Sequence, residues 1–270
     1  MTYAAILVSG ASRGLGAATA RVAAGLGAGV ALMARSADDL EAIAREIEAS
    51  GGQALPLVGD VSQVDDCRHA VEATVGRFGR LDAVINNAGI LTPIAPIAEA
   101  DPEAWQQNWI VNVLGPFLLT QAALPFLREH QGRVLNVSSG AAVSVIEGWS
   151  AYCASKAAVN HFTRVLAAEE PELTAVAFRP GVVDTRMQTL IRNEGSAGMP
   201  AEVHERFLGY HAQGDLLPPQ LPGCSLAVLA LYAPRDWSGA FVQWNEERVL
   251  SLVRQYAAAP CAGGQEETHA

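Results

Sequence analysis

Short apolar runs alternate with longer helical patterns along almost the whole chain, and this alternation constrains the fold more than any other feature. Seven runs are predicted to be strands: residues 4–9, 30–35, 54–59, 81–86, 134–138, 175–179 and 240–244. Their continuous apolar character is typical of strands buried on both faces of a parallel sheet. Helical patterns separate them, at residues 15–26, 37–49, 64–78, 102–129, 151–168 and about 221–232. The order predicts an α/β protein with a doubly wound, seven-stranded parallel sheet and helices on both faces.

Residues 182–219 interrupt this rhythm. The segment is rich in Gly and Pro and follows a predicted strand, at the sheet edge where ligands bind in open α/β folds. We therefore expect an irregular substrate loop there, acting as a lid. No linker divides the chain, so residues 1–256 are predicted to form one domain and residues 257–270 a flexible tail. Within the pattern at 102–129, Asp101 and Pro102 form a start signal, and Pro116 predicts a bend.

The composition narrows the function classes. The formal charge of −10 over 270 residues argues against a nucleic-acid partner, because binding phosphates requires a basic surface. No apolar run approaches the roughly 18 residues of a membrane span, and no signal peptide is recognised. Cys67, Cys153, Cys224 and Cys261 show neither a zinc nor a dithiol spacing. Four unpaired thiols predict a reducing compartment, so we expect a cytoplasmic protein without a metal ion or a membrane partner.

A glycine-rich turn joins the first predicted strand to the first helical pattern. Gly10, Gly14 and Gly16 allow a tight turn and let a phosphate approach the N–H groups of the helix N-terminus. The spacing G-x-x-x-G-x-G differs from the G-x-G-x-x-G dinucleotide fingerprint and from a Walker loop. It therefore indicates a nucleotide site mainly through its position at the start of a βαβ unit.

The end of the second predicted strand bears on which nicotinamide cofactor binds. An Asp or Glu there would hold the ribose hydroxyls of NAD, but this chain has Arg35 and Ser36. Arg35 and Arg13 would attract the 2′-phosphate of NADP(H), although both could also be solvated surface arginines. Asp60 ends the third strand and could accept a hydrogen bond from the adenine amino group.

Tyr152 and Lys156 lie four residues apart, on one face of a predicted helix. An ammonium beside a phenol is expected to lower the tyrosine pKa from about 10 toward neutrality, which gives a proton donor for carbonyl chemistry. Most Tyr/Lys pairs at this spacing are exposed surface residues without a catalytic role, so only the surrounding motifs make a catalytic role for this pair credible. That context is the glycine turn, the run Asn86-Asn87-Ala88-Gly89 and Ser139.

Together these residues resemble the short-chain dehydrogenase/reductase family, which has a Rossmann fold. The resemblance runs from Ala5 to about Glu247. Its motifs occur in order: the glycine turn, Asp60-Val61, Asn86 to Gly89, Asn112, Ser139, Tyr152-x-x-x-Lys156 and Arg179-Pro180-Gly181. Ser9 stands where the family usually has threonine, and it keeps the hydroxyl.

The resemblance implies the catalytic residues Asn112, Ser139, Tyr152 and Lys156. Tyr152 would be the general acid in carbonyl reduction, and Ser139 would donate a hydrogen bond to the substrate oxygen. Lys156 would hold the nicotinamide ribose and keep the tyrosine acidic, and Asn112 would position a water that relays protons to Lys156. The plainer alternatives are that Ser138 and Ser139 merely end a strand and that Asn112 is a buried helix asparagine.

The resemblance also implies NADP(H) as cofactor. The residues expected to bind it are Gly10, Ser12, Arg13, Gly14, Leu15, Gly16, Arg35, Ser36, Asp60, Val61, Asn87, Ala88, Gly89, Tyr152, Lys156, Pro180, Gly181, Val183 and Thr185. Val182 and Thr185 would contact the nicotinamide carboxamide.

The C-terminal half is similar to the sepiapterin reductase-like branch, although Gln243 stands where an acidic residue anchors the pterin. Relatives in this branch reduce α-diketones and other activated ketones, which favours NADPH-dependent reduction of a hydrophobic ketone or α-diketone. Candidates for an apolar pocket wall are Val145, Ile146, Trp149, Val183, Met187 and Leu190.

Other functions stay open at this point: NAD(P)-dependent alcohol oxidation, a non-catalytic nucleotide sensor or scaffold, and a sugar-nucleotide epimerase or dehydratase. The intact Ser139, Tyr152 and Lys156 set argues against a scaffold. The roughly 90 residues after Gly181 are too few for the substrate domain of the epimerases. Relatives pair through helices equivalent to residues 102–129 and 151–168, so a homodimer or homotetramer is expected.

Overall fold

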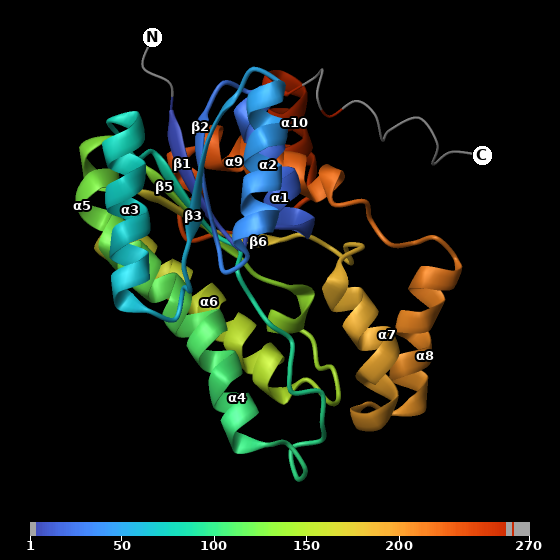
Figure 1. Ribbon diagram of the computed structural model, residues 1–270. Helices are drawn as coiled ribbons and strands as arrows, with labels where there is room; N and C mark the ends of the chain where they lie inside the picture. Colours follow the sequence, from blue (N-terminus) through green and yellow to red (C-terminus); the bar gives the residue numbers. More distant parts are fainter. Residues whose placement is uncertain (1–3, 258–260, 262–270) are drawn as a thin grey trace.

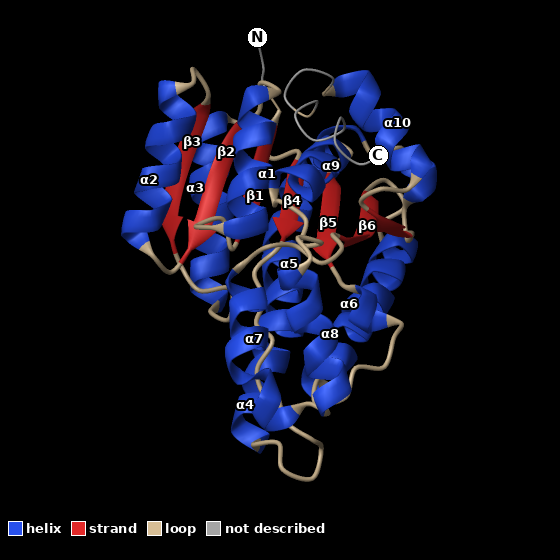
Figure 2. Ribbon diagram, turned by 90° about the vertical axis from the view of Figure 1, so that its right-hand side faces the viewer, coloured by secondary structure: helices blue, strands red, loops and turns tan. Residues whose placement is uncertain are grey.

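A single sheet of seven parallel strands forms the centre of the computed structural model, which describes residues 4–257 and residue 261. The strand order is β3-β2-β1-β4-β5-β6-β7 (Figures 1 and 2). The strands are β1 (Ala5–Ser9), β2 (Gly29–Ala34), β3 (Gln53–Val58), β4 (Ala83–Asn86), β5 (Arg133–Val137), β6 (Thr174–Arg179) and β7 (Phe241–Gln243). Every predicted strand is present with its ends within two residues, which confirms the doubly wound α/β fold.

Two helical layers cover the sheet (Figure 1). The first contains α1 (Gly14–Gly25), α2 (Ala37–Ala49), α9 (Gln220–Tyr232) and α10 (Glu247–Tyr256), and the second contains α3 (Val64–Phe78), α5 (Gly115–Glu129) and α6 (Ser150–Glu169). Because side chains alternate along a strand, Ile6 and Val8 pack under the first layer and Leu7 under the second. The expectation of burial on both faces is wrong for the edge strand β3, where Val58 is exposed, because the second layer barely reaches this edge.

The predicted long helix at residues 102–129 is two α-helices joined by a π-helical turn. α4 (Pro102–Trp109) begins as expected, since the Asp101 carboxylate accepts a hydrogen bond from the Ala104 N–H at 2.9 Å. The π-helix Ile110–Leu114 then leads into α5. The irregular turn thus lies just before Pro116, where a bend was expected, and Pro116 is the second residue of α5. By length and composition alone, Pro102–Glu129 could cross a membrane, with a mean hydropathy of 1.7 in its most apolar window. Polar residues such as Asn112 and Gln121 interrupt the apolar side chains of this helix, so it contains no continuous apolar run of that length, and 44% of the window is buried as in a core helix.

Residues 182–219 form a helical hairpin rather than an irregular loop. α7 (Arg186–Gly198) and α8 (Ala201–Ala212) stand beyond the carboxyl edge of the sheet (Figure 1). Gly198 and Pro200, which suggested a loop, lie at the turn between the two helices. The expectation of an irregular loop is therefore wrong for most of this segment, which is helical.

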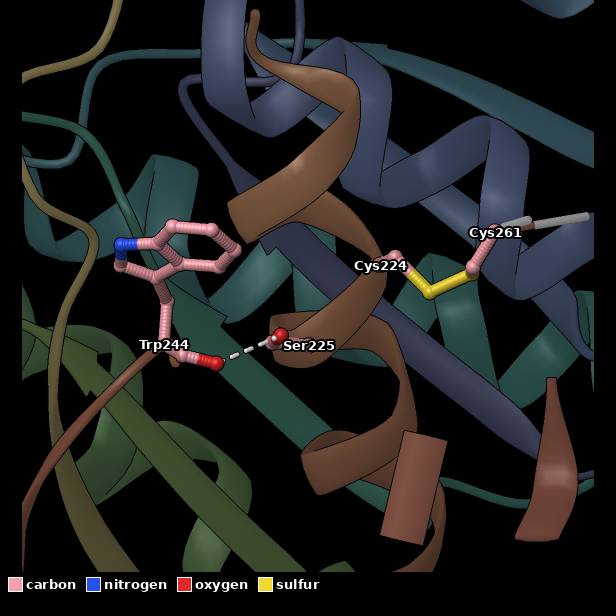
Figure 3. Close-up of a disulfide and its surroundings, with 4 residues drawn as sticks. All are labelled: Cys224, Ser225, Trp244 and Cys261. Carbon is pink, nitrogen blue, oxygen red and sulfur yellow. Dashed lines mark hydrogen bonds between the residues drawn. A yellow bond between two sulfur atoms is a disulfide. The ribbon is translucent and has the colours of Figure 1, made fainter. Parts of the chain in front are cut away.

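The C-terminal part of the chain also departs from expectation. Helix α10 was not predicted; it is short and buries mainly Val249 and Val253. Cys224 of α9 forms a disulfide bond with Cys261, their Cα atoms lying 6.2 Å apart (Figure 3). The expectation of four unpaired thiols is therefore wrong, and the argument for a reducing compartment no longer holds. The rest of the predicted flexible tail, residues 258–260 and 262–270, lies outside the described part of the chain.

Candidate active site

The glycine turn after β1 is shaped for close backbone approach. Gly10 has a φ of +65°, which favours glycine. A Cβ atom at Gly16 would lie 2.3 Å from the Gly10 carbonyl oxygen and 2.5 Å from Asn87 Nδ2, so no larger residue fits there. Helix α1 begins at Gly14 and no side chain caps its first turn. Its free N–H groups and partial positive charge suit a phosphate.

Ser9 and Asn87 lock this turn to the end of β4. The Ser9 hydroxyl accepts hydrogen bonds from the N–H groups of Asn87 at 3.0 Å and Ala88 at 3.2 Å. Asn87 Nδ2 donates to the Ser9 and Gly10 carbonyl oxygens at 3.0 and 3.1 Å. Asn86 instead belongs to the core beneath, where its Nδ2 donates to Asn136 at 2.8 Å. The Ser9 hydroxyl thus joins β1 to the end of β4, at the position where the family usually has a threonine hydroxyl.

Polar groups also surround the region where an adenosine would lie. The Arg35 side chain is 72% exposed, and its Nη1 lies 3.7 Å from an Asp60 carboxylate oxygen. Such an exposed ion pair is weak, so the guanidinium stays free to bind another anion. Across the turn, the Thr185 Cγ2 atom lies 3.1 Å from the position of a Cβ at Gly14. The residues present therefore fit a dinucleotide extended along the carboxyl edge of the sheet.

Helix α6 carries Tyr152 and Lys156 on one buried face, as the spacing predicts. Tyr152 is 6% exposed and Lys156 is 4% exposed. Lys156 Nζ donates a hydrogen bond to the Val137 carbonyl oxygen at 2.8 Å and lies 5.6 Å from the centre of the Tyr152 ring. Ser139 follows β5 and makes a side-chain hydrogen bond with Tyr152, while its Oγ accepts from the Ala141 N–H at 3.1 Å. The structure thus brings Ser139, Tyr152 and Lys156 together.

Burial controls the ionisation of this pair. It raises the pKa of Tyr152 to about 12, although the hydrogen bond with Ser139 acts in the opposite direction. Burial also lowers the pKa of Lys156 to about 8. The expectation that Lys156 lowers the tyrosine pKa is therefore wrong for the protein without cofactor. Burial removes water from a phenolate, and this raises the pKa more than the neighbouring groups lower it. The phenol is consequently protonated at neutral pH.

Asn112 lies in the π-helix and is fully buried. Its Oδ1 accepts from the Ile90 N–H at 2.9 Å, and its Nδ2 donates to the Ile90 carbonyl oxygen at 2.8 Å. Asn108, four residues earlier, donates to the Thr92 carbonyl oxygen at 2.8 Å and accepts from Asn112. These asparagines fix the loop after β4 beside α6. Asn108 was missed by the sequence analysis, although its i, i+4 spacing from Asn112 was a usable signal.

An aromatic cluster covers Tyr152. Trp149 contacts it edge-on, with ring centres 5.7 Å apart, and Phe207 of α8 packs on Trp149 at 5.0 Å. The expected wall residues Ile146, Trp149, Met187 and Leu190 belong to this cluster. Val145 is 93% exposed, so its assignment to the pocket wall is wrong. Phe207 was missed because its segment was interpreted as a loop.

Comparison with known proteins agrees with this arrangement. The family model for the short chain dehydrogenase matches residues 4–195. A benzil reductase ((S)-benzoin forming) of Saccharomyces cerevisiae is 35% identical over 256 residues, covering 90% of this chain and 97% of that protein.

Solved structures give the same result. The crystal structure of a short chain dehydrogenase/reductase from Saccharomyces cerevisiae, 35% identical, superimposes with a TM-score of 0.88 over 92% of this chain and 99% of its own. A variant of actinorhodin polyketide ketoreductase solved with NADPH is 25% identical and gives a TM-score of 0.80 over 89% of this chain and 95% of its own. The resemblance in the motifs is thereby confirmed, and the chain belongs to the short-chain dehydrogenase family of oxidoreductases.

Proposed function

We propose that this protein is an NADPH-dependent reductase that converts a hydrophobic ketone or α-diketone into an alcohol, with Tyr152 as the general acid. The observation that carries the proposal is the burial of Tyr152 against Ser139, with Lys156 one helical turn away. The relative whose name is benzil reductase supports a carbonyl substrate and, more narrowly, a diketone. The apolar side chains around Tyr152 suit a hydrophobic compound.

In this proposal, Tyr152 and Ser139 act together on the substrate oxygen. A bound nicotinamide supplies the hydride. Tyr152 holds its proton at neutral pH because burial raises its pKa to about 12, so it can give that proton to the oxygen as negative charge develops there. Ser139 donates a second hydrogen bond to the same oxygen. The buried, apolar surroundings exclude water and strengthen both interactions.

Lys156 and Asn112 are proposed to position the cofactor and to return a proton to Tyr152. We assign Lys156 Nζ to the ribose of the nicotinamide half of the cofactor, next to the Val137 carbonyl that already binds it. Gly89 separates it from Asn112: a Cβ there would lie 3.2 Å from Asn112 Oδ1 and 3.6 Å from Lys156 Nζ. The absence of a side chain at position 89 leaves room for a water between the two groups. Such a water would return a proton toward Tyr152 through Lys156.

NADPH is proposed over NADH on the strength of Arg35. Its exposed guanidinium follows β2, where an acidic residue would otherwise hold the NAD ribose. Ser36 and Arg13 add polar and positive groups on the same side, and the solved ketoreductase contains NADPH. The glycine turn and Thr185 would hold the remainder of the cofactor.

Following NADPH consumption over a panel of ketones and diketones, with NADH in parallel, tests the proposal. Tyr152→Phe is expected to lower turnover by about a hundredfold or more, since it removes the general acid. The same variant should bind NADPH as tightly as the wild type in a fluorescence titration. Equal turnover of wild type and variant would contradict the proposal. A wild type that binds NADPH but reduces no ketone would favour a non-catalytic scaffold.

We also propose a homodimer or homotetramer formed through α4, α5 and α6. Trp109, Leu114, Phe117 and Val165 are large apolar side chains that stay 37–42% exposed on these helices. A surface hollow of about 530 Å³ lies between α4 and α6, where its lining residue Trp105 stacks on Trp109 with ring centres 5.6 Å apart. Its lining is mainly apolar and consists of Ile97, Ala100, Pro102, Trp105, Ser150 and Ala154. A second copy of the chain would cover this surface and explain the apolar character of the 102–129 helix.

A further inference from the structure

The indole N–H of Trp149 is buried and has no hydrogen-bond partner among the described residues. Trp149 is 5% exposed and directly precedes α6, three residues before Tyr152. An indole nitrogen can only donate, and a buried donor without an acceptor destabilises a folded protein. Native proteins satisfy nearly all such groups, so an exception requires an explanation.

The position of Trp149 suggests that explanation. Its ring stands edge-on to the Tyr152 ring, at 86° between planes, and Phe207 packs against it from α8. The indole therefore lies between the proposed proton donor and the α7–α8 hairpin. Nearby buried side chains, including Leu91, Ile191 and Met199, are apolar or weakly polar and offer it no strong acceptor. The Trp149 ring is therefore a direct neighbour of the phenol that is proposed to hold the substrate carbonyl.

A second unpartnered polar atom belongs to the same region. Gln188 is 7% exposed, and its Oε1 has no partner among the described residues. Gln188 lies on the buried face of α7 with Ile191, which is a member of the cluster around Tyr152. A carboxamide presents both a donor and an acceptor, whereas the Trp149 N–H has one function only. Trp149 therefore gives the sharper prediction about the ligand.

We propose that Trp149 is a specificity-determining residue that donates its N–H to a second oxygen of the substrate, beside the reacting carbonyl. The inference rests on the proposed reductase function and narrows it to carbonyl compounds with an adjacent acceptor, such as α-diketones and α-hydroxy ketones. The reacting oxygen is already served by Tyr152 and Ser139. A second oxygen would be buried unpaired in an apolar cluster unless Trp149 bound it. Binding pairs two groups at once, and sites built this way reject analogues that lack the oxygen.

Two diaryl ketones that differ at one position provide the test. Benzil carries two adjacent carbonyl groups, and deoxybenzoin replaces one of them with a methylene group. For Trp149→Phe, kcat/KM with benzil is expected to fall about tenfold, the loss of one well-placed hydrogen bond, while the value with deoxybenzoin changes by less than about twofold. Trp149→His, which restores a ring N–H, should regain part of the preference for benzil.

The matched control is Trp237→Phe, because Trp237 packs under Arg248 away from the aromatic cluster. It should leave both kcat/KM values unchanged. Equal losses with both ketones in Trp149→Phe, or no loss with either, would overturn the inference while leaving the proposed function intact. A wild type that reduces neither ketone would overturn both. The unfolding midpoint and NADPH affinity of Trp149→Phe, expected to stay near the wild-type values, separate a specific effect from a folding defect.

Discussion

Lys156 Nζ donates a hydrogen bond to the carbonyl oxygen of Val137, the last residue of β5, at 2.8 Å. This bond ties the middle of α6 to the carboxyl edge of the sheet. Because Tyr152 lies one turn earlier on the same helix, the bond also helps to position Tyr152 near that edge. The position is energetically unfavourable for a cation, because Lys156 is 4% exposed and no carboxylate pairs with it among the described residues.

The first prediction concerns the titration of Lys156. Burial lowers its pKa to about 8, from the ordinary value of 10.5. Lys156 is the only lysine in the sequence, so selective ¹⁵N-lysine labelling gives a single side-chain signal. We expect that signal to titrate near pH 8 in the cofactor-free protein. A midpoint above pH 10 would show that the ammonium reaches water and would remove the basis of the prediction.

The same shift predicts how stability depends on pH. Between pH 8 and 10 the unfolded chain keeps the lysine proton and the folded protein loses it, so the contribution of Lys156 to the free energy of unfolding should rise with pH, while the raised pKa values of the Cys67 and Cys153 thiols act in the opposite direction. The expected slope is about 1.4 kcal/mol per pH unit at most. Above pH 10 the raised pKa of Tyr152 acts in the opposite direction, because the folded protein then retains the proton that the unfolded chain loses. Urea denaturation of wild type and Lys156→Met isolates the lysine: the difference between their free energies of unfolding should shift in favour of the wild type as the pH rises over this range.

The sequence predicted the parts of the site that depend on local pattern. Continuous apolar runs located all seven strands, because strands buried in a parallel sheet have no polar alternation. The four-residue spacing placed Tyr152 and Lys156 on one helix face, and the motif order placed Ser139 beside them. Each of these inferences needs only a period or a short motif.

The parts that failed depend on contacts between distant residues. The pairing of Cys224 with Cys261 cannot be deduced from their spacing. The Tyr152 pKa follows from burial under Trp149 and Phe207, and the second of these comes from a hairpin interpreted as a loop. The Gly and Pro content of residues 182–219 was misinterpreted because these residues have the same local signature at the turn of a helical hairpin as in a loop.

A further prediction tests the choice of cofactor. Arg35→Ala should raise the KM for NADPH by roughly tenfold to a hundredfold, since a charge-assisted hydrogen bond to phosphate contributes about 1.5–3 kcal/mol. The KM for NADH should change by less than about twofold, because NADH lacks that phosphate. Steady-state kinetics with a single ketone and both cofactors measure the two values. Equal effects on NADPH and NADH would contradict a role in binding the 2′-phosphate.

The disulfide gives a prediction about stability. Cys224 and Cys261 are separated by 37 residues, and closing a loop of this length stabilises a fold by roughly 4 kcal/mol at most in the chain-entropy model. Adding a reductant should therefore lower the urea midpoint of the wild type. The double variant Cys224→Ala, Cys261→Ala should show the lowered midpoint with or without reductant.

The effect of reduction on activity should be smaller. Ser225, the neighbour of Cys224, donates a hydrogen bond to the Trp244 carbonyl oxygen at 2.9 Å (Figure 3). Trp244 in turn packs near Gly181, so α9 is connected to the cofactor edge without the disulfide. We expect turnover at low temperature to be similar in oxidised and reduced protein. A wild type whose midpoint ignores reductant would contradict the predicted stabilisation.

The last prediction concerns assembly. Val165 lies one turn beyond Phe162 on α6, and Phe162 contacts Phe117 of α5 edge-on, so these residues form one apolar face. Val165→Glu places a charge in the proposed interface, where both copies would bury it unpaired. Light scattering should show an oligomer for the wild type and a smaller species for this variant. Val58→Glu is the matched control, because Val58 is also an exposed valine but lies on the edge strand β3. The oligomer should survive in the control; a wild type that is already monomeric would contradict the proposed interface.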